Sequence, residues 1–263
     1  MERLTLGGLA KLGIAGIDLK AAFQRSGCPI CRLKQEAAHR YIKGLLGENL
    51  NDVTTRVHVA RSLGFCTDHS WQLYHTEMAR FGDGLGTSIL YEDLTRRIVQ
   101  GLRDLEVQPA TTPDRRHWWQ RRWARLRAIV GYPSLAAPHL GGLLPQEPCP
   151  VCTHAAESEI RDLHLLIEGC ADPTFRDWYA ASEGLCLPHL RQTLAQAAQA
   201  DPDVARFLAA TAAGRLQVLI TDLGEYIRKH AWKYHEEPLT NGEKDSPRRA
   251  SQFFAGPPGE EEG

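Results

Sequence analysis

The chain has 263 residues, a formal net charge of −1, and 43% hydrophobic and 24% charged residues. These values are ordinary for a soluble globular protein that buries a substantial core, as one large domain or two smaller ones. The near-zero net charge excludes a global attraction to nucleic acid or to a membrane surface. No apolar run reaches the roughly 20 residues that a membrane-spanning helix needs, so we expect no transmembrane segment.

Residues 1–26 form an N-terminal lead that is apolar and rich in glycine. Lys11 and Asp18 interrupt it, and it lacks a convincing small-residue cleavage site, so we interpret it as something other than a signal peptide. Cysteine pairs combined with histidines are typical of a reducing compartment, where thiols are free to hold metal. The sequence therefore predicts a cytoplasmic protein.

Residues 27–107 carry a first set of metal-ligand residues within a helical pattern. A Cys-Pro-Ile-Cys run at 28–31 is followed by Gly-Phe-Cys-Thr-Asp-His at 64–69. An apolar stripe with a four-residue period lies between them and predicts an amphipathic helix. The stripe consists of Leu33, Ala37, Tyr41 and Leu45. A short helix is expected over 53–63 and a long amphipathic helix over 86–98.

The segment 82–87, Gly-Asp-Gly-Leu-Gly-Thr, superficially resembles a phosphate-binding loop. It follows a helix rather than a strand, and it lacks the Gly-Lys-Ser/Thr end of such loops. We interpret it as a flexible loop that ends in a helix cap at Thr87 or Ser88.

Residues 108–147 form an insert between the two sets. Thr112-Pro113 predicts a helix start, and six arginines and three tryptophans then lie within residues 115–127. The arginines are Arg115, Arg116, Arg121, Arg122, Arg125 and Arg127. Such a basic amphipathic helix can bind nucleic acid, an anionic membrane surface or an acidic partner. The favoured interpretation is a helix that packs its tryptophans on the domain and leaves its arginines in solvent.

Residues 148–235 repeat the first arrangement. Cys-Pro-Val-Cys at 149–152 is followed by Gly-Leu-Cys-Leu-Pro-His at 184–189. The gap between the paired cysteines and the following Cys-x-x-His is 35 positions in the first set and 34 in the second. Matching helices are predicted over 157–168, 174–182 and 214–227. We predict an all-α fold of two pseudo-repeated units, each a helical hairpin clamped by a Cys₃His metal site plus a long packing helix.

A polar tail completes the predicted organisation. Residues 236–263 contain Pro238 and end in a Gly-Pro-Pro-Gly-Glu-Glu-Glu-Gly run, so their end is expected to be disordered. One docking turn is expected over 248–254. Gly64 and Gly184 stand where a helix C-terminal glycine is expected.

The two sets place six of the seven cysteines and two of the eleven histidines at metal-ligand spacing. Three thiolates and one imidazole form a closed tetrahedral site, which favours zinc. The predicted ligands are Cys28, Cys31, Cys66, His69, Cys149, Cys152, Cys186 and His189. We predict two zinc ions per chain. An iron–sulfur cluster is the minor alternative, because such clusters are more often held by cysteine alone.

Helix starts are expected to present these ligands. Proline suits the first helical position, so Cys28 and Cys149 are predicted N-caps, and Thr67 or Asp68 is expected to cap the helix of the first Cys-x-x-His. Two pairings of the ligand pairs stay open. Pairing within each repeat is favoured, because a helical hairpin returns the chain to its start. Sharing between repeats, with Cys28 and Cys31 meeting Cys186 and His189, is the alternative.

Other signals favour ordinary explanations. His75-Thr76-Glu77 together with 148–152 mimics a zinc deaminase signature, but the halves lie far apart and no α/β pattern surrounds them. Cys170 has no counterpart in the first set and is interpreted as a buried apolar residue. His154 is interpreted as a surface residue or a neighbour of the ligands. Two redox-active CxxC pairs would leave the repeated Cys-x-x-His unexplained.

The motifs at 28–31, 64–69, 149–152 and 184–189, together with the Gly-x-x-Ile-Leu-Tyr-Glu-Asp-Leu helix at 86–94, resemble an uncharacterised prokaryotic family. The resemblance covers most of the chain outside the basic insert and the far tail. It implies no known reaction.

Closed ligand sets without an acid–base or nucleophile constellation favour a non-enzymatic scaffold or interaction module with an unknown protein partner. One alternative is a thiol-based redox sensor that releases zinc on oxidation. Another is binding to nucleic acid or an anionic membrane surface through residues 115–127.

Overall fold

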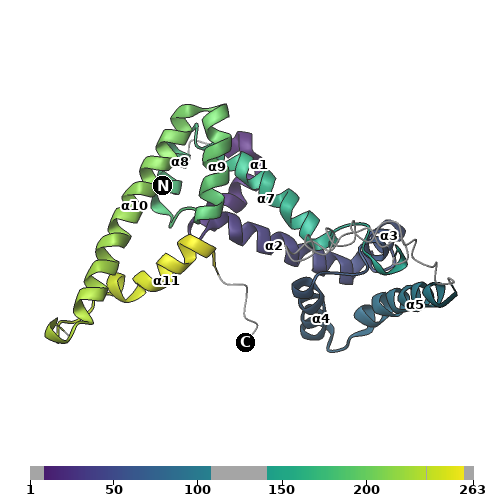
Figure 1. Ribbon diagram of the computed structural model, residues 1–263. Coiled ribbons are helices and arrows are strands. Elements are labelled where there is room, and N and C mark those ends of the chain that lie inside the picture. Colours follow the sequence, from purple (N-terminus) through teal and green to yellow (C-terminus); the bar gives the residue numbers. More distant parts are fainter. Residues whose placement is uncertain (1–8, 108–140, 235, 258–263) are drawn as a thin grey trace, which may run out of the picture. The chain divides into compact units, whose positions relative to one another are not determined.

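The computed structural model describes residues 9–107, 141–234 and 236–257, with side chains described within 16–103, 142–234 and 236–257. These residues form α-helices joined by short turns, and the described part of the chain contains no strand (Figure 1). The all-α fold class is therefore confirmed.

Two compact units divide the chain. The first comprises Met1–His39 and His154–Gly263, and the second comprises Arg40–Thr153. Their boundaries fall within the two helices that follow the Cys-Pro-x-Cys motifs. These helices are α2 (Pro29–Gly44) and α7 (Pro150–Gly169). Both helices were predicted. Each compact unit, however, contains the first residues of one of these two helices together with most of the other sequence repeat.

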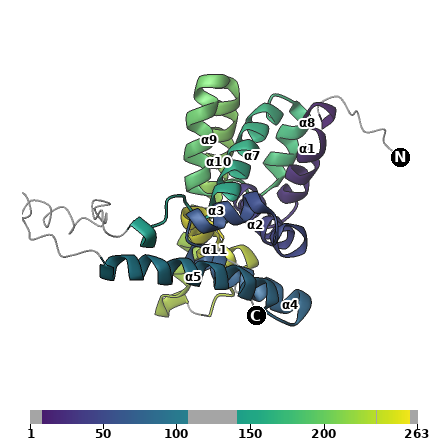
Figure 2. The same cartoon turned by 90° about the vertical axis from the view of Figure 1, so that its right-hand side faces the viewer.

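Four helices of the first unit pack together with α2 and α7 around one apolar core (Figure 2). They are α1 (Leu9–Phe23), α8 (Pro173–Ala181), α9 (Leu187–Ala200) and α10 (Pro202–Lys229). Helices α1 and α8 meet through edge-to-face aromatic contacts, because the Phe23 ring lies 5.4 Å from that of Phe175 and 5.9 Å from that of Tyr179. Such contacts add to the energy of apolar burial and fix the orientation of the rings.

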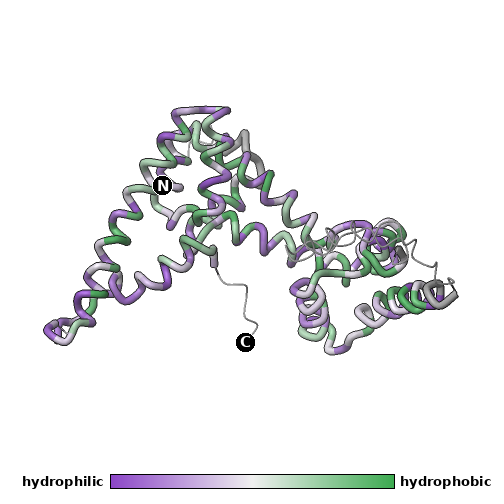
Figure 3. Tube along the Cα trace, in the orientation of Figure 1, coloured by the Kyte–Doolittle hydropathy of each residue, from purple (hydrophilic) through white to green (hydrophobic). Residues whose placement is uncertain are grey.

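Helices α9 and α10 form a hairpin with Asp201 at its corner (Figure 1). The Asp201 carboxylate accepts hydrogen bonds from the backbone N–H groups of Asp203 and Val204, and it thereby caps α10. Helix α10 passes the length and composition test for a membrane span, although apolar and polar residues are interspersed along it (Figure 3). Its residues Val204 and Leu208 are fully buried in the core of the first unit, but only 22% of its most apolar 18-residue window is buried.

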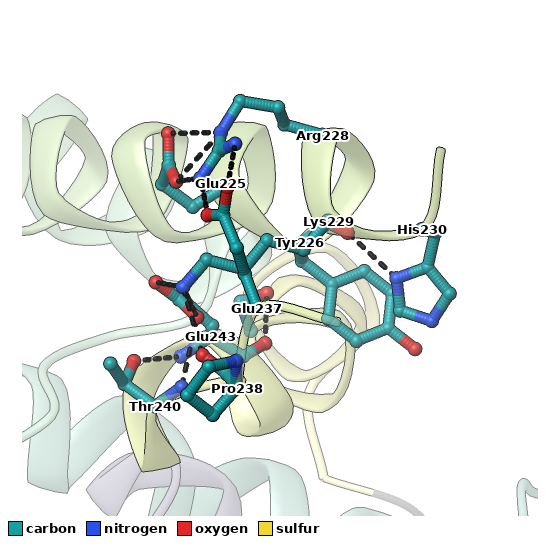
Figure 4. Close-up of polar contacts among 10 residues, drawn as sticks. Glu225, Tyr226, Arg228, Lys229, His230, Glu237, Pro238, Thr240 and Glu243 are labelled. Atoms are coloured by element: carbon teal, nitrogen blue, oxygen red, sulfur yellow. Dashed lines mark hydrogen bonds and ion pairs between the residues drawn. The ribbon is translucent and has the colours of Figure 1, made fainter. Parts of the chain in front are cut away.

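Helix α11 (Asn241–Ala255) packs against α9 and α10, after a short 3₁₀ turn at Trp232–Tyr234. These residues lie in the segment assigned to the polar tail, where only one docking turn was expected. A capping box between Thr240 and Glu243 begins the helix, and the Glu243 carboxylate also accepts hydrogen bonds from Lys229 Nζ at 2.7 and 2.9 Å (Figure 4). The Lys229 and Glu243 side chains are only 10% and 8% exposed. This buried ion pair holds the start of α11, whose sequence is polar, against the end of α10.

The second unit contains α3 (Val53–Arg61), α4 (Thr67–Phe81) and α5 (Leu85–Val107), with a π-helical turn at Leu45–Asn49 and a 3₁₀ turn at Gly141–Leu143. Helix α3 and helix α5 confirm the helices predicted over 53–63 and 86–98. The buried apolar residues of this unit are Ile42, Leu45, Leu46, Val59, Leu73, Leu90, Leu94 and Val151.

The glycine-rich loop before α5 has a different cap from the one predicted. The buried carboxylate of Glu77 accepts hydrogen bonds from the backbone N–H groups of Gly86 and Thr87 and from the Thr87 hydroxyl. The side chain of Glu77 is 3% exposed. An internal carboxylate therefore occupies the helix start that a bound phosphate would need.

Candidate metal centres

Each of the four ligand pairs, the two Cys-Pro-x-Cys and the two Cys-x-x-His motifs, lies at the start of a helix, and we call each pair a ligand arm. Pro29 and Pro150 are the first residues of α2 and α7, so each Cys-Pro-x-Cys places one sulfur just before the helix and one within its first turn. Cys66 and Cys186 are the N-cap residues of α4 and α9, with extended backbones. The prediction that Thr67 or Asp68 caps α4 is wrong. The partial positive charge at a helix N-terminus favours thiolate and so favours metal binding.

A glycine with positive φ precedes each Cys-x-x-His. The φ angles are +98° at Gly64 and +83° at Gly184, in the left-handed region that other residues rarely adopt. At Gly184 a Cβ atom would also lie 2.2 Å from Nη1 of Arg215. Glycine therefore lets the chain turn from α3 or α8 into the ligand arm, as the repeated Gly-x-Cys spacing predicted.

The ligands gather in two groups, and each group contains residues from both sequence repeats. Centre A consists of Cys28, Cys31, Cys186 and His189, all in the first unit. Centre B consists of Cys66, His69, Cys149 and Cys152, all in the second unit. Within each group, the donor atoms lie within 4.8 Å of one another. The favoured pairing within repeats is therefore wrong, and the alternative of sharing between repeats is the arrangement found.

Helix lengths explain why the hairpin argument failed. The 16 residues of α2 rise about 24 Å, whereas the nine residues of α3 rise only about 14 Å. The 20 residues of α7 rise about 30 Å, and the nine residues of α8 again rise only about 14 Å. The returning helix is too short in both repeats to bring the Cys-x-x-His arm back to the cysteine pair where its own repeat began.

The distances in centre A match a tetrahedral site. The His189 Nδ1 atom lies 3.4 Å from the sulfur of Cys28, 3.3 Å from that of Cys31 and 3.1 Å from that of Cys186. The sulfurs of Cys31 and Cys186 are 3.6 Å apart. Zinc bonds of about 2.3 Å to sulfur and about 2.0 Å to nitrogen imply separations of about 3.8 and 3.6 Å in a tetrahedron. A disulfide, at about 2.05 Å, does not fit the sulfur–sulfur distance.

Centre B has the same geometry. The His69 Nδ1 atom lies 3.1 Å from the sulfur of Cys66, 3.6 Å from that of Cys149 and 3.3 Å from that of Cys152. The sulfurs of Cys66 and Cys152 are 3.6 Å apart. Both centres therefore present Nδ1 and three sulfurs toward one point.

A buried carboxylate orients the histidine of centre A. The Nε2 atom of His189 lies 3.0 Å from Oε1 of Glu159, and Oε2 of Glu159 pairs with Lys34 Nζ at 2.6 Å. If Nε2 carries the proton that Glu159 accepts, the lone pair of Nδ1 faces the sulfurs, as a metal ligand requires. The side chains of His189 and Glu159 are only 6% and 12% exposed, so this hydrogen bond is sheltered from water.

Sequence reasoning missed Glu159 and Lys34. Glu159 stands seven residues after Cys152, on the same helix face, yet it serves the other centre. Only the exchanged pairing makes it a neighbour of His189. When the two repeats are aligned in sequence at Cys31 and Cys152, the residue equivalent to Glu159 is Ala38. Among the described residues, none accepts a hydrogen bond from Nε2 of His69.

The two centres also differ in burial. Cys28, Cys186 and His189 of centre A are 4%, 2% and 5% exposed, whereas all four ligands of centre B are half-buried. Centre A is therefore the better sheltered of the two. Centre B is more accessible to water, oxidants and chelators.

Crowding of the four ligands perturbs their protonation. Hydrogen bonding with the Cys186 sulfur raises the pKa of Cys31, and hydrogen bonds from Cys28 and Cys31 lower the pKa of Cys186. Burial opposes a charge on His189, but hydrogen bonds to the Cys186 and Cys28 sulfurs raise its pKa to about 10. In centre B, burial and the neighbouring Cys66 sulfur raise the pKa of Cys152 to about 12. A divalent cation would stabilise the thiolate forms that crowding and burial disfavour.

Two other candidate residues lie outside both ligand sets. Cys170 is fully buried, and burial raises the pKa of its thiol to about 12, which fits the interpretation as a buried apolar residue. His154 is half-buried in α7 and belongs to neither group. The deaminase-like reading has no support in the ligand geometry, because Cys149 and Cys152 meet Cys66 and His69.

The basic segment 115–127, with its six arginines, lies outside the described residues, as do the last six residues of the tail. Binding of nucleic acid or an anionic membrane surface through these arginines stays a proposal. Replacing the six arginines with glutamine would abolish salt-dependent binding if the proposal holds and leave it unchanged otherwise.

Comparisons with known proteins add a family but no activity. The model of a family described as a family of unknown function, DUF6062, matches residues 10–261. A curated relative, the uncharacterized 23.9 kDa protein in the xynA 3' region of Caldicellulosiruptor sp. (strain Rt8B.4), is 32% identical over 87 residues. That match covers 33% of this chain and 39% of the relative, so the chain spans well under half of the relative's length. No solved structure matches the chain.

Proposed function

We propose a function for this chain, which belongs to the DUF6062 family of unknown function. It is a non-enzymatic cytoplasmic scaffold held together by two structural zinc ions. The observation that carries the proposal is the convergence of three sulfurs and one imidazole nitrogen at each of two places. The scaffold would present helical surfaces to a protein partner.

The donor set supports a structural rather than a catalytic metal. Four protein ligands fill a tetrahedral zinc site, whereas catalytic zinc keeps a position for water or substrate. Thiolate and imidazole ligands favour zinc over magnesium, calcium or manganese, which prefer oxygen ligands. The carboxylate behind His189 in centre A is the kind of partner that raises ligand basicity and fixes the ring.

Each ion would tie together parts of the chain that are far apart in sequence. Cys31 and Cys186 are 155 positions apart, and Cys66 and Cys152 are 86 positions apart. By analogy with disulfides, closing loops of this length removes about 5 kcal/mol of chain entropy from the unfolded state. Zinc would therefore act as the main cross-link of each unit, in a chain whose described cysteines form no disulfide.

Helix α4 supports the interaction role. It begins at the ligand arm of centre B and carries an exposed apolar stripe at three- and four-residue spacing. The stripe consists of Trp71, Tyr74, Met78 and Phe81, which are 60%, 38%, 38% and 49% exposed. Exposed tryptophan, tyrosine and methionine are enriched in protein interfaces. An apolar face of a partner helix has the chemistry to cover this stripe.

Elemental analysis of anaerobically purified protein tests the metal proposal. We expect two zinc ions per chain and no visible absorption from an iron–sulfur cluster. The Cys170→Ala variant is the matched control, because it removes the one cysteine outside the centres and should keep both ions. Far less than one metal ion per chain would contradict the proposal.

A second candidate function is a redox switch at centre B. It is favoured by the partial exposure of the centre B ligands and by the 3.6 Å approach of the Cys66 and Cys152 sulfurs. Hydrogen peroxide would accept two electrons from the two thiolates, the sulfur–sulfur bond would form, two protons would complete two waters, and zinc would leave. Peroxide treatment should then release one zinc reversibly. Retention of both ions would rule the switch out.

A further inference from the structure

A cavity lies beside centre A within the first unit. It has a volume of about 300 Å³ and is bounded by the segment Ser182–Cys186, by α10 and by α11. Neither the ligand geometry nor the family comparison assigns it a role. A cavity of this size lies at the lower end of those that bind small molecules.

The walls of the cavity are mainly apolar. Leu185 comes from the segment before Cys186, Leu216 and Leu219 come from α10, and Phe253 comes from α11. Leu185 and Leu219 are 6% and 8% exposed, so these walls are fixed by the core of the unit. An occupant with an apolar body would bury its surface here, which stabilises binding by the hydrophobic effect.

Two guanidinium groups also line the cavity. Arg215 lies over the Tyr179 ring and donates hydrogen bonds from Nη2 to the carbonyl oxygens of Tyr179 and Ala180. Its Nε and Nη1 groups make no hydrogen bond to a described residue, and no described carboxylate pairs with it. Arg249 differs, because Asp222 and Asp245 neutralise its charge. The Nε of Arg249 is nevertheless buried without a hydrogen-bond acceptor.

The charge of the lining points to a monoanion. Its charged residues are Arg215, Arg249 and Glu183, and because Asp222 and Asp245 neutralise Arg249, Arg215 is the lining cation without a carboxylate partner among the described residues. The carboxylate of Glu183 already accepts a hydrogen bond of 2.7 Å from the backbone N–H of Gly27. A single negative group would pair with the charge of Arg215, whereas a dianion would exceed that one positive charge.

We propose that this cavity binds a small amphipathic carboxylic acid, with its carboxylate at Arg215 and its apolar body against Leu216, Leu219 and Phe253. At about 30 Å³ per non-hydrogen atom, the cavity holds roughly ten such atoms. Octanoate has this size and this charge. Because Cys28 and Cys186 line the same cavity, the bound acid would lie directly beside centre A.

Isothermal titration of the full, metal-loaded chain with octanoate tests the proposal. Octylamine and octan-1-ol, which keep the apolar body and change the head group, are the comparison ligands. We expect saturable binding of one octanoate per chain, weaker binding of the alcohol and none of the amine. No octanoate binding at millimolar concentration, or equal binding of the amine, would overturn the proposal.

Three variants locate the binding. Arg215→Gln should weaken octanoate binding at least tenfold through loss of the charge-assisted contact. Ala212→Leu adds bulk to the lining without removing charge and should also prevent binding, with folding checked by thermal melting. Arg191→Gln, at an exposed arginine on α9 outside the lining, is the matched control and should bind as the wild type does. Unchanged binding in both cavity variants would overturn the assignment.

The contact with centre A provides a separate readout, and this part rests on the proposed function. In cobalt-substituted protein, octanoate should shift the visible bands of the ion in centre A. Metal content measured on the same samples separates the two proposals. Two zinc ions without octanoate binding would overturn the cavity proposal alone, and octanoate binding without zinc would overturn the scaffold proposal alone.

Discussion

Replacing Glu159 with alanine should weaken metal binding at centre A and leave centre B unchanged. The Glu159 carboxylate is the only hydrogen-bond acceptor that the described residues offer to Nε2 of His189, at 3.0 Å. Without it, the imidazole loses the partner that fixes its orientation and that favours a lone pair on Nδ1. The two side chains are 12% and 6% exposed, so water cannot fully replace the lost carboxylate.

The expected loss is a 10- to 100-fold weaker zinc affinity at one of the two sites, or about 1.4 to 2.7 kcal/mol. The upper part of this range is favoured because the pair of His189 and Glu159 is buried. The Lys34→Met variant keeps Glu159 and should show a smaller loss.

Competition with a chromophoric zinc chelator measures this loss, because two ions of different affinity are released in two steps. The Glu157→Ala variant is the matched control, since Glu157 is an exposed acidic residue on the same helix, two positions away. It should release both ions as the wild type does. Wild-type affinity of both ions in Glu159→Ala, or equal weakening of both, would refute the reasoning.

Four further variants test other parts of the structure through urea unfolding. Glu77→Ala leaves the first N–H groups of α5 without an acceptor and should lower the free energy of unfolding by about 3 kcal/mol, whereas a loss under 0.5 kcal/mol would contradict the cap. Gly184→Ala, at φ +83°, should cost about 1–2 kcal/mol, whereas Gly214→Ala, in open space within α10, should stabilise by about 1 kcal/mol; the same sign for both would count against the turn argument. Hydrogen bonding to Lys229 lowers the pKa of Glu243 below its ordinary value of 4.5, so its contribution is complete above pH 4.5 and disappears as the pH falls through the lowered value. The stability gap between the wild type and Glu243→Gln should therefore be constant from pH 7 to 5 and shrink below 4.5, and a gap that widens in acid would contradict the pairing.

Much of the local structure could be predicted, because it depends on short-range rules. Proline after Cys28 and Cys149 marks two helix starts, and glycine before Cys66 and Cys186 marks the turn into each ligand arm. All eight predicted ligands lie in two groups of four, although the groups differ from those that the spacing favoured. These signals lie within a few residues of one another, so one chain is enough to read them.

The pairing of the ligands could not be read in this way. It depends on how far α3 and α8 carry the chain back. Both were predicted as short helices, over 53–63 and 174–182, but the hairpin argument did not compare their rise with that of the longer helices before them. Glu159 was missed for the same reason, because its role appears only once the exchanged pairing is known.

Helix α11 shows a different limit. Its sequence is polar, and composition alone favoured a tail. The helix is ordered by Thr240 and Glu243 at its start and by the buried contact of Glu243 with Lys229, a residue 14 positions earlier (Figure 4). A long-range contact of this kind leaves no periodic signal in the sequence.

The zinc content of paired cysteine variants tests the exchanged pairing most directly. Cys28→Ser/Cys186→Ser removes two ligands of centre A, so this protein should keep one zinc ion per chain, at centre B. Cys28→Ser/Cys66→Ser removes one ligand from each centre and should lose both ions or bind both weakly. The opposite pattern, with one firmly bound zinc in Cys28→Ser/Cys66→Ser and none in Cys28→Ser/Cys186→Ser, would show that each repeat holds its own metal and would contradict this account.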